Sequence, residues 1–288
     1  MPTATELLDE AERILKASDR IDHPHAGKER FDGEEILEFI LGRAPSGRQR
    51  IPDPAARRFR RLIDRRASGE PVAYITGSAK FRGLTLEVRR GGFIPRESTE
   101  FMALQAIRRL RPRQRPVHVD LATGVGPVAL AVADAIRRAR VFGVDISTSA
   151  LALARRNAAR LKLGNVTFLR GDLFAPLPNR LLGTVDAITI HPPYVPRGEM
   201  RDLPEEITRF EPKESITDFS RTGMRLLERT AAEAPRWLAR HGWLLVEVSP
   251  DRSRSVMSLL RGAGFRDIRS TMGPVRFTRV IVGRAPVA

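Results

Sequence analysis

A rigid turn with hydrogen-bonding side chains follows one apolar run of the sequence. The run VDAITI, residues 185–190, leads directly into His191, Pro192, Pro193 and Tyr194. Consecutive prolines have no N–H to donate and hold an extended turn, so their carbonyl oxygens stay free to accept hydrogen bonds from a substrate N–H. The ring of Tyr194 can confine a planar group beside them. These residues are therefore the candidate catalytic residues, and they suit an acceptor with an amide or an exocyclic amine.

Small and acidic residues end three earlier apolar runs. In VDLATGVG, residues 119–126, the glycines let the backbone approach a ligand ahead of free helix N–H groups. Asp145 ends the next run, where a carboxylate can accept both ribose hydroxyls, and Asp172 and Leu173 can border an adenine. Because no phosphate-binding lysine or GxGxxG is present, a cofactor with a ribose and no phosphates fits best. This indicates S-adenosylmethionine, with Asp120 near its amino group; a plain tight turn and a helix-capping Asp145 are the alternatives.

The order of the apolar runs predicts an α/β fold. Short runs that are apolar on both faces alternate with helical segments, as strands of a mostly parallel sheet do when helices cover both faces. Two later runs, FRDIRSTM and RFTRVIVGR, are expected to add an antiparallel edge. The other predicted strands are VHVDLA, RVFGVDI, VTFLRGD, VDAITI and GWLLVEV, and the helices between them include GPVALAVADAIRRA and TSALALARRNAARLK. The carboxyl ends of parallel strands meet at one edge, so the candidate residues are expected to share one site.

The first part of the chain has helical periodicity. Apolar residues recur at helical spacing in residues 3–17, and GEEILEFILG and DPAARRFRRLIDRRASG are typical of two more short helices. From Pro71 the pattern changes to β-branched and aromatic residues punctuated by glycine, which indicates a hairpin that ends near Gly91. The expected domains are a helical N-terminal domain at 1–70, a β-hairpin linker at 71–92 and a catalytic domain at 93–288.

The composition limits the classes of protein. Cysteine is absent, which excludes disulfides and thiolate metal sites, and the histidines lack the spacing of a metal site, so no metal is expected. No stretch approaches the roughly 20 apolar residues of a membrane span, so we expect a cytoplasmic protein without a membrane partner. The net charge is +16. It is compatible with direct nucleic-acid binding, but no aromatic residues interleave the arginines as a stacking platform requires, so a solvated surface is favoured.

The motifs taken together resemble one enzyme family. The chain resembles the bacterial HemK/PrmC-like protein-(glutamine-N5) methyltransferases, which modify the Gly-Gly-Gln motif of peptide chain release factors and carry Asn-Pro-Pro-Tyr at the positions of residues 191–194. Further similarity lies in GEPVAYITGSAKFRGLTLEV, FIPRESTE, FEPKESI and AAEAPRWLARHGWLLVEV, and it covers roughly residues 70–250. The resemblance implies a Rossmann-like class I S-adenosylmethionine-dependent methyltransferase with a seven-stranded, mostly parallel sheet and a small helical N-terminal domain joined by a β-hairpin.

The resemblance also implies a role for each matching position. Position 191 and the Pro192 carbonyl would accept the two hydrogens of a substrate amide, with Tyr194 packed beside it. The implied cofactor-binding residues are Asp120, Ala122, Thr123, Gly124, Gly126, Asp145, Ile146, Asp172, Leu173 and His191. The implied substrate channel is formed by Phe93, Pro95 and Arg96.

The catalytic motif departs from the family at its first residue. His191 replaces an Asn, so a carbonyl acceptor and an NH₂ donor become one acceptor nitrogen and one N–H on a larger ring. Ala122 replaces the first glycine of the turn, and TDFSRTG, residues 217–223, replaces an acidic Gly-Gly loop. Glutamine methylation through one retained acceptor contact, general-base catalysis on another acceptor, and loss of activity all stay open at this point.

The sequence as a whole predicts an S-adenosylmethionine-dependent N-methyltransferase. The favoured acceptor is a glutamine side-chain amide of a protein partner, a peptide chain release factor, recognised in part by the N-terminal domain. One alternative is a diverged paralogue that methylates a small molecule or a nucleobase in specialised metabolism. The other is a non-catalytic protein that binds the cofactor.

Overall fold

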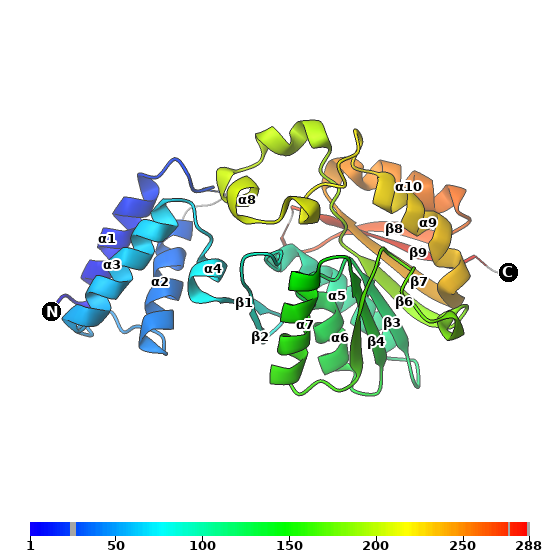
Figure 1. The fold of residues 1–288 in the computed structure, drawn as a ribbon, viewed down its shortest axis with the longest axis horizontal. Coiled ribbons are helices and arrows are strands. Elements are labelled where there is room, and N and C mark those ends of the chain that lie inside the picture. The colour runs from blue at the N-terminus through cyan, green and yellow to red at the C-terminus, as the bar shows by residue number, and fades with distance from the viewer. Residues whose placement is uncertain (24–26, 276, 287–288) are drawn as a thin grey trace. The chain divides into compact units, whose positions relative to one another are not determined.

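The protein is described by a computed structural model that covers residues 1–23, 27–275 and 277–286 (Figure 1). His25 and the first residue of the predicted strand RFTRVIVGR lie outside these ranges. The helices are α1 (Ala4–Lys16), α2 (Lys28–Leu41), α3 (Asp53–Ala67), α4 (Val72–Thr76), α5 (Glu97–Leu110), α6 (Pro127–Ala135), α7 (Thr148–Arg160), α8 (Glu205–Phe210), α9 (Arg225–Trp237) and α10 (Ser253–Gly262). Within the described ranges, no helix has both the length and the apolar character that crossing a bilayer requires.

The chain divides into two compact units. The first comprises residues 1–78 together with 201–211, and the second comprises residues 79–200 and 212–288. The chain therefore passes between the units three times, whereas the sequence pattern indicated a single linker. The strands are β1 (Ser78–Phe81), β2 (Leu84–Glu87), β3 (Val117–Leu121), β4 (Arg140–Asp145), β5 (Val166–Arg170), β6 (Val185–Ile190), β7 (Leu238–Val248), β8 (Arg266–Met272) and β9 (Arg279–Arg284).

Helices α1, α2 and α3 build the core of the first unit. Helix α1 begins with a capping box, in which the Thr3 hydroxyl accepts from the Glu6 N–H and the Glu6 carboxylate accepts from the Thr3 N–H. Helix α2 begins at Lys28, earlier than the predicted segment, directly after Gly27 at φ +88°. The core side chains include Leu7, Leu8, Leu15, Ile36, Leu37, Phe59 and Ile63. Their helical spacing confirms the helices predicted at residues 3–17 and 53–69.

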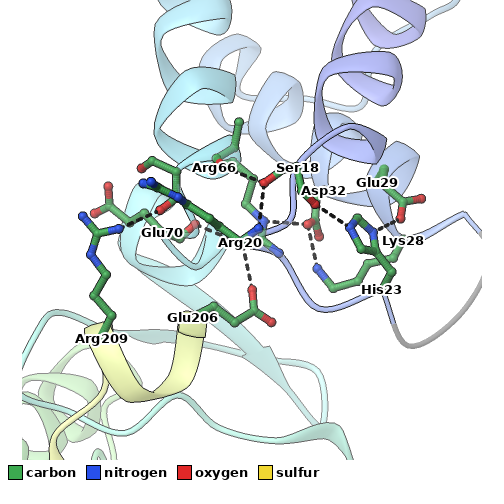
Figure 2. Close-up of polar contacts among 12 residues, drawn as sticks. Ser18, Arg20, His23, Lys28, Glu29, Asp32, Arg66, Glu70, Glu206 and Arg209 are labelled. Atoms are coloured by element: carbon green, nitrogen blue, oxygen red, sulfur yellow. Dashed lines mark hydrogen bonds and ion pairs between the residues drawn. The ribbon is translucent and has the colours of Figure 1, made fainter. Parts of the chain in front are cut away.

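A buried ion-pair network ties residues 201–211 to the helices of the first unit (Figure 2). Arg66 on α3 is only 1% exposed; its Nε lies 2.7 Å from Asp32 Oδ2 and its Nη1 lies 2.8 Å from Glu206 Oε2. Lys28 also contacts the Asp32 carboxylate, at 2.8 Å. A buried guanidinium is tolerated only when carboxylates pair with it, so Arg66 needs both of its partners. Local sequence patterns do not reveal this long-range pairing.

The second unit is a three-layer α/β fold. Its sheet has the strand order β5-β4-β3-β6-β7-β9-β8, and β9 is antiparallel to both of its neighbours. Helices α5, α6 and α7 pack on one face, and α9 and α10 pack on the other (Figure 1). This arrangement confirms the predicted seven-stranded, mostly parallel sheet, with its reversed strand one place in from the edge.

The strand order places a switch point at the carboxyl end of β3. The chain continues from β3 to β4 on one side, and β6 pairs with β3 on the other side. Loops that leave in opposite directions open a crevice at such a point, where α/β sheets bind ligands. The parallel register aligns Asp120 with Gly143 and with Thr189, so the turns after all three strands meet at this edge.

Residues 71–92 contain a shorter hairpin than the sequence pattern indicated. Strands β1 and β2 pair with each other, and Arg82 and Gly83 between them have φ of +48° and +79°. Positive φ at both loop residues is the signature of a type I′ turn, which matches the twist of a tight hairpin. The preceding residues form the short helix α4, which ends at Gly77 with φ +77°. Val72, Tyr74 and Ile75 are therefore buried residues of a short helix rather than of a paired strand.

Candidate active site

A cavity of about 340 Å³ opens at the carboxyl ends of β3, β4, β5 and β6. This volume lies within the usual range of small-molecule sites, roughly 300–1,000 Å³. The sequence-predicted residues that line it are Phe93, Pro95, Arg96, Asp120, Ala122, Thr123, Gly124, Asp145, Ile146, Asp172, Leu173, His191, Pro192 and Pro193. Gly126 and Tyr194 are not lining residues; Gly126 packs on the ring of Phe168, and the Tyr194 ring lies beside that of His191.

Asp120 is a buried carboxylate at the end of β3. The hydroxyls of Thr123 and Thr189 each donate to it at 2.6 Å, and burial raises its pKa to about 6. Because the Thr189 hydroxyl donates to Asp120, it accepts from His118 Nε2–H at 2.9 Å. Burial lowers the pKa of His118 to about 3, so this ring is neutral and completes the hydrogen-bond chain. A carboxylate in such a place suits a cationic ligand group, which offsets the cost of burying its charge.

The turn after β3 presents its backbone to the cavity. Ala122, Gly124 and Gly126 have φ of +51°, +56° and +89°, all in the left-handed region. The Gly124 N–H donates to the Asp145 carboxylate at 2.7 Å, and a Cβ on Gly124 would meet no atom within 4 Å. A Cβ on Gly126 would lie 3.0 Å from the Phe168 ring, so this glycine serves the packing of the helix on the strand. Of the two glycines in this turn, Gly124 is therefore the one at which the backbone is open to a ligand.

Asp145 supports the turn and ends β4. Its second carboxylate oxygen accepts from the Ser147 N–H at 2.8 Å. The N-cap of α7 is Ser147, whose hydroxyl accepts from the Ala150 N–H at 3.2 Å, so Asp145 is not the capping residue. Burial raises the pKa of Asp145, and its backbone hydrogen bonds oppose this rise. Beside it, the Ile146 side chain is 55% exposed at the cavity wall and offers an apolar surface that a flat ring can cover.

His191 stands at the end of β6 among aromatic and polar side chains. Its Nδ1 lies 3.3 Å from the Thr99 hydroxyl and 3.9 Å from Glu247 Oε2. The Phe93 ring meets the imidazole edge-on, with ring centroids 6.0 Å apart, and the Tyr194 ring is tilted against it at 5.8 Å. Burial raises the pKa of Tyr194 to about 12, so its hydroxyl keeps its proton near neutral pH. Tyr194 therefore fixes the imidazole by packing and by shape rather than by charge.

The charge of the cavity differs from that of the chain. The acidic residues that line it are Asp120, Asp145, Asp172, Glu214 and Asp218. The basic residues that line it are Arg96, Arg225 and Arg229. Arg229 pairs with Asp172 at 2.8 Å, and the Arg96 guanidinium lies 4.5 Å over the Phe93 ring. In a chain of net charge +16, this excess of carboxylates favours a ligand that carries positive charge.

Comparison with known proteins agrees with this geometry. The family model described as "PrmC N-terminal domain" matches residues 6–77, and the one described as "Methyltransferase domain" matches residues 119–211. A release factor glutamine methyltransferase of Geobacter sulfurreducens is 35% identical over 78% of this chain and 77% of its own length. One of Yersinia pestis is 34% identical over 90% of this chain and 94% of its own. The chain belongs to the release factor glutamine methyltransferase family.

A solved structure shares the fold of this family member. A methyltransferase from Pyrococcus furiosus superposes with a TM-score of 0.52 at 15% identity, and covers 81% of this chain and 100% of its own. A likeness at this identity concerns the fold alone. The predicted α/β methyltransferase fold is thus confirmed by both its topology and its relatives.

Three residues that the sequence did not point to lie at or next to the site. Thr99 contacts the His191 ring, Asp218 lines the cavity while only 3% exposed, and Glu247 lies beside the imidazole. One signal was available: Glu247 is a charged residue inside the apolar run GWLLVEV, where a buried carboxylate needs a reason. In the described part of the chain, no three His, Asp or Glu side chains are grouped so that they could hold a metal ion.

Proposed function

We propose that this protein is an S-adenosylmethionine-dependent N-methyltransferase whose acceptor is a glutamine side-chain amide of a peptide chain release factor. One observation carries the proposal. The His-Pro-Pro-Tyr turn ends β6 beside a cavity whose carboxylates suit a cationic cofactor, in a member of a family named for this activity. The amide and the cofactor would meet where the turn and the cavity join.

The cavity fits the charges and shape of the cofactor. Asp120 would hold the cationic amino group, the open Gly124 backbone would lie along the methionine part, and Asp145 would face the ribose. Asp172 and Leu173 would border the adenine, beside the exposed apolar wall at residue 146. When bound, S-adenosylmethionine supplies a methyl group on a sulfonium that is already activated for attack. The protein therefore has to bind, align and exclude water.

The turn at the end of β6 would align the acceptor. The nitrogen of an amide is a poor nucleophile because its lone pair is delocalised into the carbonyl. Acceptors at position 191 and at the Pro192 carbonyl would hold its two hydrogens and favour the pyramidal form, in which the lone pair is available to the methyl carbon. The Phe93 and Tyr194 rings, which both lie next to the imidazole, would confine the planar amide.

A second candidate function rests on His191 itself. Imidazole can act as a general base toward an acceptor other than an amide, which Asn cannot. The replacement of the family's acidic Gly-Gly loop by residues 217–223 points in the same direction. The alternative acceptor is a small molecule or a nucleobase. The third candidate is a protein that binds the cofactor without transferring the methyl group. Measurement of binding and of transfer in one preparation distinguishes it from the two enzyme candidates.

The N-terminal unit is the proposed recognition domain for the protein substrate. Its helices match the family's N-terminal domain, and the structure joins residues 201–211, which follow the His-Pro-Pro-Tyr turn, to the same unit. A substrate bound to this unit would therefore be linked through the chain to the segment that lines the cavity. We place the protein in the cytoplasm, where its proposed substrate acts.

The first test measures cofactor binding and transfer in one preparation. S-adenosylhomocysteine is titrated into the protein by calorimetry, and the protein is then incubated with S-adenosylmethionine and a release factor before peptide mass spectrometry. We expect binding, and one added methyl group on the glutamine of Gly-Gly-Gln. Absence of binding would overturn the enzyme assignment. Binding without transfer to the release factor would overturn the proposed acceptor and favour the second candidate.

Matched aspartate variants test the site. Asp120→Asn is expected to weaken S-adenosylhomocysteine binding at least about 10-fold, because a charge-assisted hydrogen bond to the ligand is lost. Asp134→Asn, at a half-buried position on α6 outside the cavity, is the control and should bind within about 2-fold of the wild type. Equal affinity in the two variants would contradict the placement of the amino group at Asp120.

A further inference from the structure

The strand register places a buried carboxylate beside His191. Strands β6 and β7 are parallel, and Ile190 aligns with Val246. The next residue on each strand is therefore His191 on β6 and Glu247 on β7, side by side at the carboxyl edge of the sheet. Glu247 lies in the middle of the sheet, since β7 also pairs with β9.

Glu247 has one satisfied oxygen and one unsatisfied oxygen. It is 0% exposed, and its Oε1 accepts from the Thr278 hydroxyl at 2.8 Å. Its Oε2 is buried without a hydrogen-bond partner in the described part of the chain, and it lies 3.9 Å from His191 Nδ1. A buried carboxylate oxygen without a donor is costly, and the imidazole N–H is the donor within reach. A hydrogen bond between the pair requires this separation to shorten by about 1 Å.

We propose that Glu247 is a positioning residue that holds the proton of His191 on Nδ1, so that Nε2 offers its lone pair to the cavity and takes a proton from the substrate. This rests on the proposed function for the identity of the acceptor. The Thr99 hydroxyl lies 3.3 Å from the same Nδ1 and shares this N–H. The ring nitrogens are thereby given separate tasks, as in other carboxylate–histidine pairs.

The proposed proton transfer accounts for the proton that the amide nitrogen loses when it is methylated. The amide nitrogen forms a bond with the methyl carbon while the bond between that carbon and sulfur breaks. The electron pair of the broken carbon–sulfur bond stays on sulfur. The nitrogen then carries an excess proton, which passes to Nε2 of His191. The resulting imidazolium lies beside the Glu247 carboxylate and is stabilised by it until the proton leaves to solvent. An Asn at position 191 can orient the amide but cannot take this proton.

The tautomer of His191 can be observed without any substrate. In long-range ¹⁵N–¹H spectra, a protonated ring nitrogen and a bare one have well-separated ¹⁵N shifts. The His191 signals are assigned by their loss in His191→Asn. We expect the wild type to carry its proton on Nδ1, and Glu247→Gln to lose this preference. An Nε2–H tautomer in the wild type, or an unchanged tautomer in Glu247→Gln, would overturn the proposal even if the protein methylates a release factor.

A double-mutant cycle tests the catalytic consequence. Glu247→Gln is expected to lower kcat about 10- to 100-fold, by analogy with the loss of a carboxylate that orients a metal-bound histidine, with little change in KM or in S-adenosylhomocysteine affinity. In the His191→Asn background the same change should cost less than about 3-fold, because there is no imidazole to orient. Equal losses in the two backgrounds would reveal a merely structural carboxylate and contradict the proposal.

A matched variant separates orientation from folding. Thr278→Val removes the hydrogen bond at the other oxygen of the same carboxylate and leaves the approach of Oε2 to His191 intact. It is expected to lower the free energy of unfolding as much as Glu247→Gln while keeping the Nδ1–H tautomer. If Thr278→Val shifted the tautomer to the same extent, the effect of Glu247 would come from packing rather than from its Oε2. If the protein failed to methylate any release factor, the tautomer measured by NMR would still decide whether Glu247 positions His191, because that measurement needs no substrate.

Discussion

Asp120 is kept charged in the folded protein at a cost to stability. Burial raises its pKa from the ordinary 3.8 to about 6. Between these pH values the folded state binds more protons than the unfolded state, so the free energy of unfolding falls as the pH rises through this window. Above it, the ionised carboxylate costs on the order of 3 kcal/mol. Stability alone would favour an uncharged residue here, which agrees with the proposed role of Asp120 in binding the cationic group of the cofactor.

The pH dependence of cofactor binding follows from the same shift. S-adenosylhomocysteine carries its cationic amino group throughout, whereas Asp120 is protonated below about pH 6. We expect the affinity of the wild type to fall as the pH is lowered from 7 to 5, and that of Asp120→Asn to stay nearly flat. The variant should also unfold at a higher temperature at pH 7.5. Parallel pH curves for the two proteins in calorimetry would contradict this assignment.

Ala122 has a backbone conformation that favours glycine. Its φ is +51°, and the left-handed region costs a residue with a Cβ about 1 kcal/mol. Ala122→Gly is therefore expected to raise the free energy of unfolding by up to about 1 kcal/mol in urea titrations. Ala129→Gly, inside α6, is the control and should lower it by about 1–2 kcal/mol, because glycine weakens a helix and the substitution also removes a fully buried methyl group. A loss of stability in Ala122→Gly would show that the methyl group packs usefully.

At the scale of elements, periodicity predicted the strands well and the long-range attachments poorly. All the strand-like runs from VHVDLA onward became strands of one sheet, because runs that are apolar on both faces have few other stable arrangements. The segment after Pro71 was expected in a hairpin but begins with α4, where burial against helices overrides β-propensity. The attachment of Arg201–Glu211 depends on Arg66 and Glu206, which lie far apart in the sequence.

The Arg66–Glu206 pair should control the order of this segment. Glu206→Gln removes a charge partner from a buried guanidinium, and we expect the free energy of unfolding to fall by about 1–3 kcal/mol. Amide hydrogen exchange should rise within residues 201–211. Glu205→Gln is the control, since this neighbour forms only an exposed pair with Arg209. Similar exchange in the two variants would show that the buried pair does not hold the segment.

At the scale of the whole molecule, the net positive charge of the chain and the acidic character of its cavity differ. The sequence indicated one shared site because the glycines and carboxylates follow successive parallel strands, whose carboxyl ends converge on one edge of the sheet. Gly124 and the three aspartates do line one cavity there, whereas Gly126 packs on Phe168, and their binding of the cofactor stays a prediction. The charge inside the run GWLLVEV marked Glu247 as unusual, but the sequence could not place Glu247 or Thr99 beside His191, since these positions arise from the register of β6 with β7 and from the position of α5. The net charge of +16 gave no indication of the acidic cavity.

The first unit combines residues 1–78 with residues 201–211, so removal of the former should expose the latter to proteolysis. A chain that begins at residue 79 lacks the helices on which Arg201–Glu211 packs. Trypsin should therefore cut this chain rapidly after Arg201 and Arg209, and should cut the full chain there much more slowly. Digestion followed by mass spectrometry identifies the sites. Equal cutting rates in the two proteins would contradict the assignment of this segment to the first unit.

The most direct test of the central claim is mass spectrometry of a release factor after incubation with the wild-type protein and S-adenosylmethionine. We predict one added methyl group on the glutamine of Gly-Gly-Gln, and the same product with His191→Asn, which restores the family's motif. The Asp120→Asn variant should form it far more slowly. An unmodified glutamine after incubation with wild-type protein that binds S-adenosylhomocysteine would contradict the proposed acceptor.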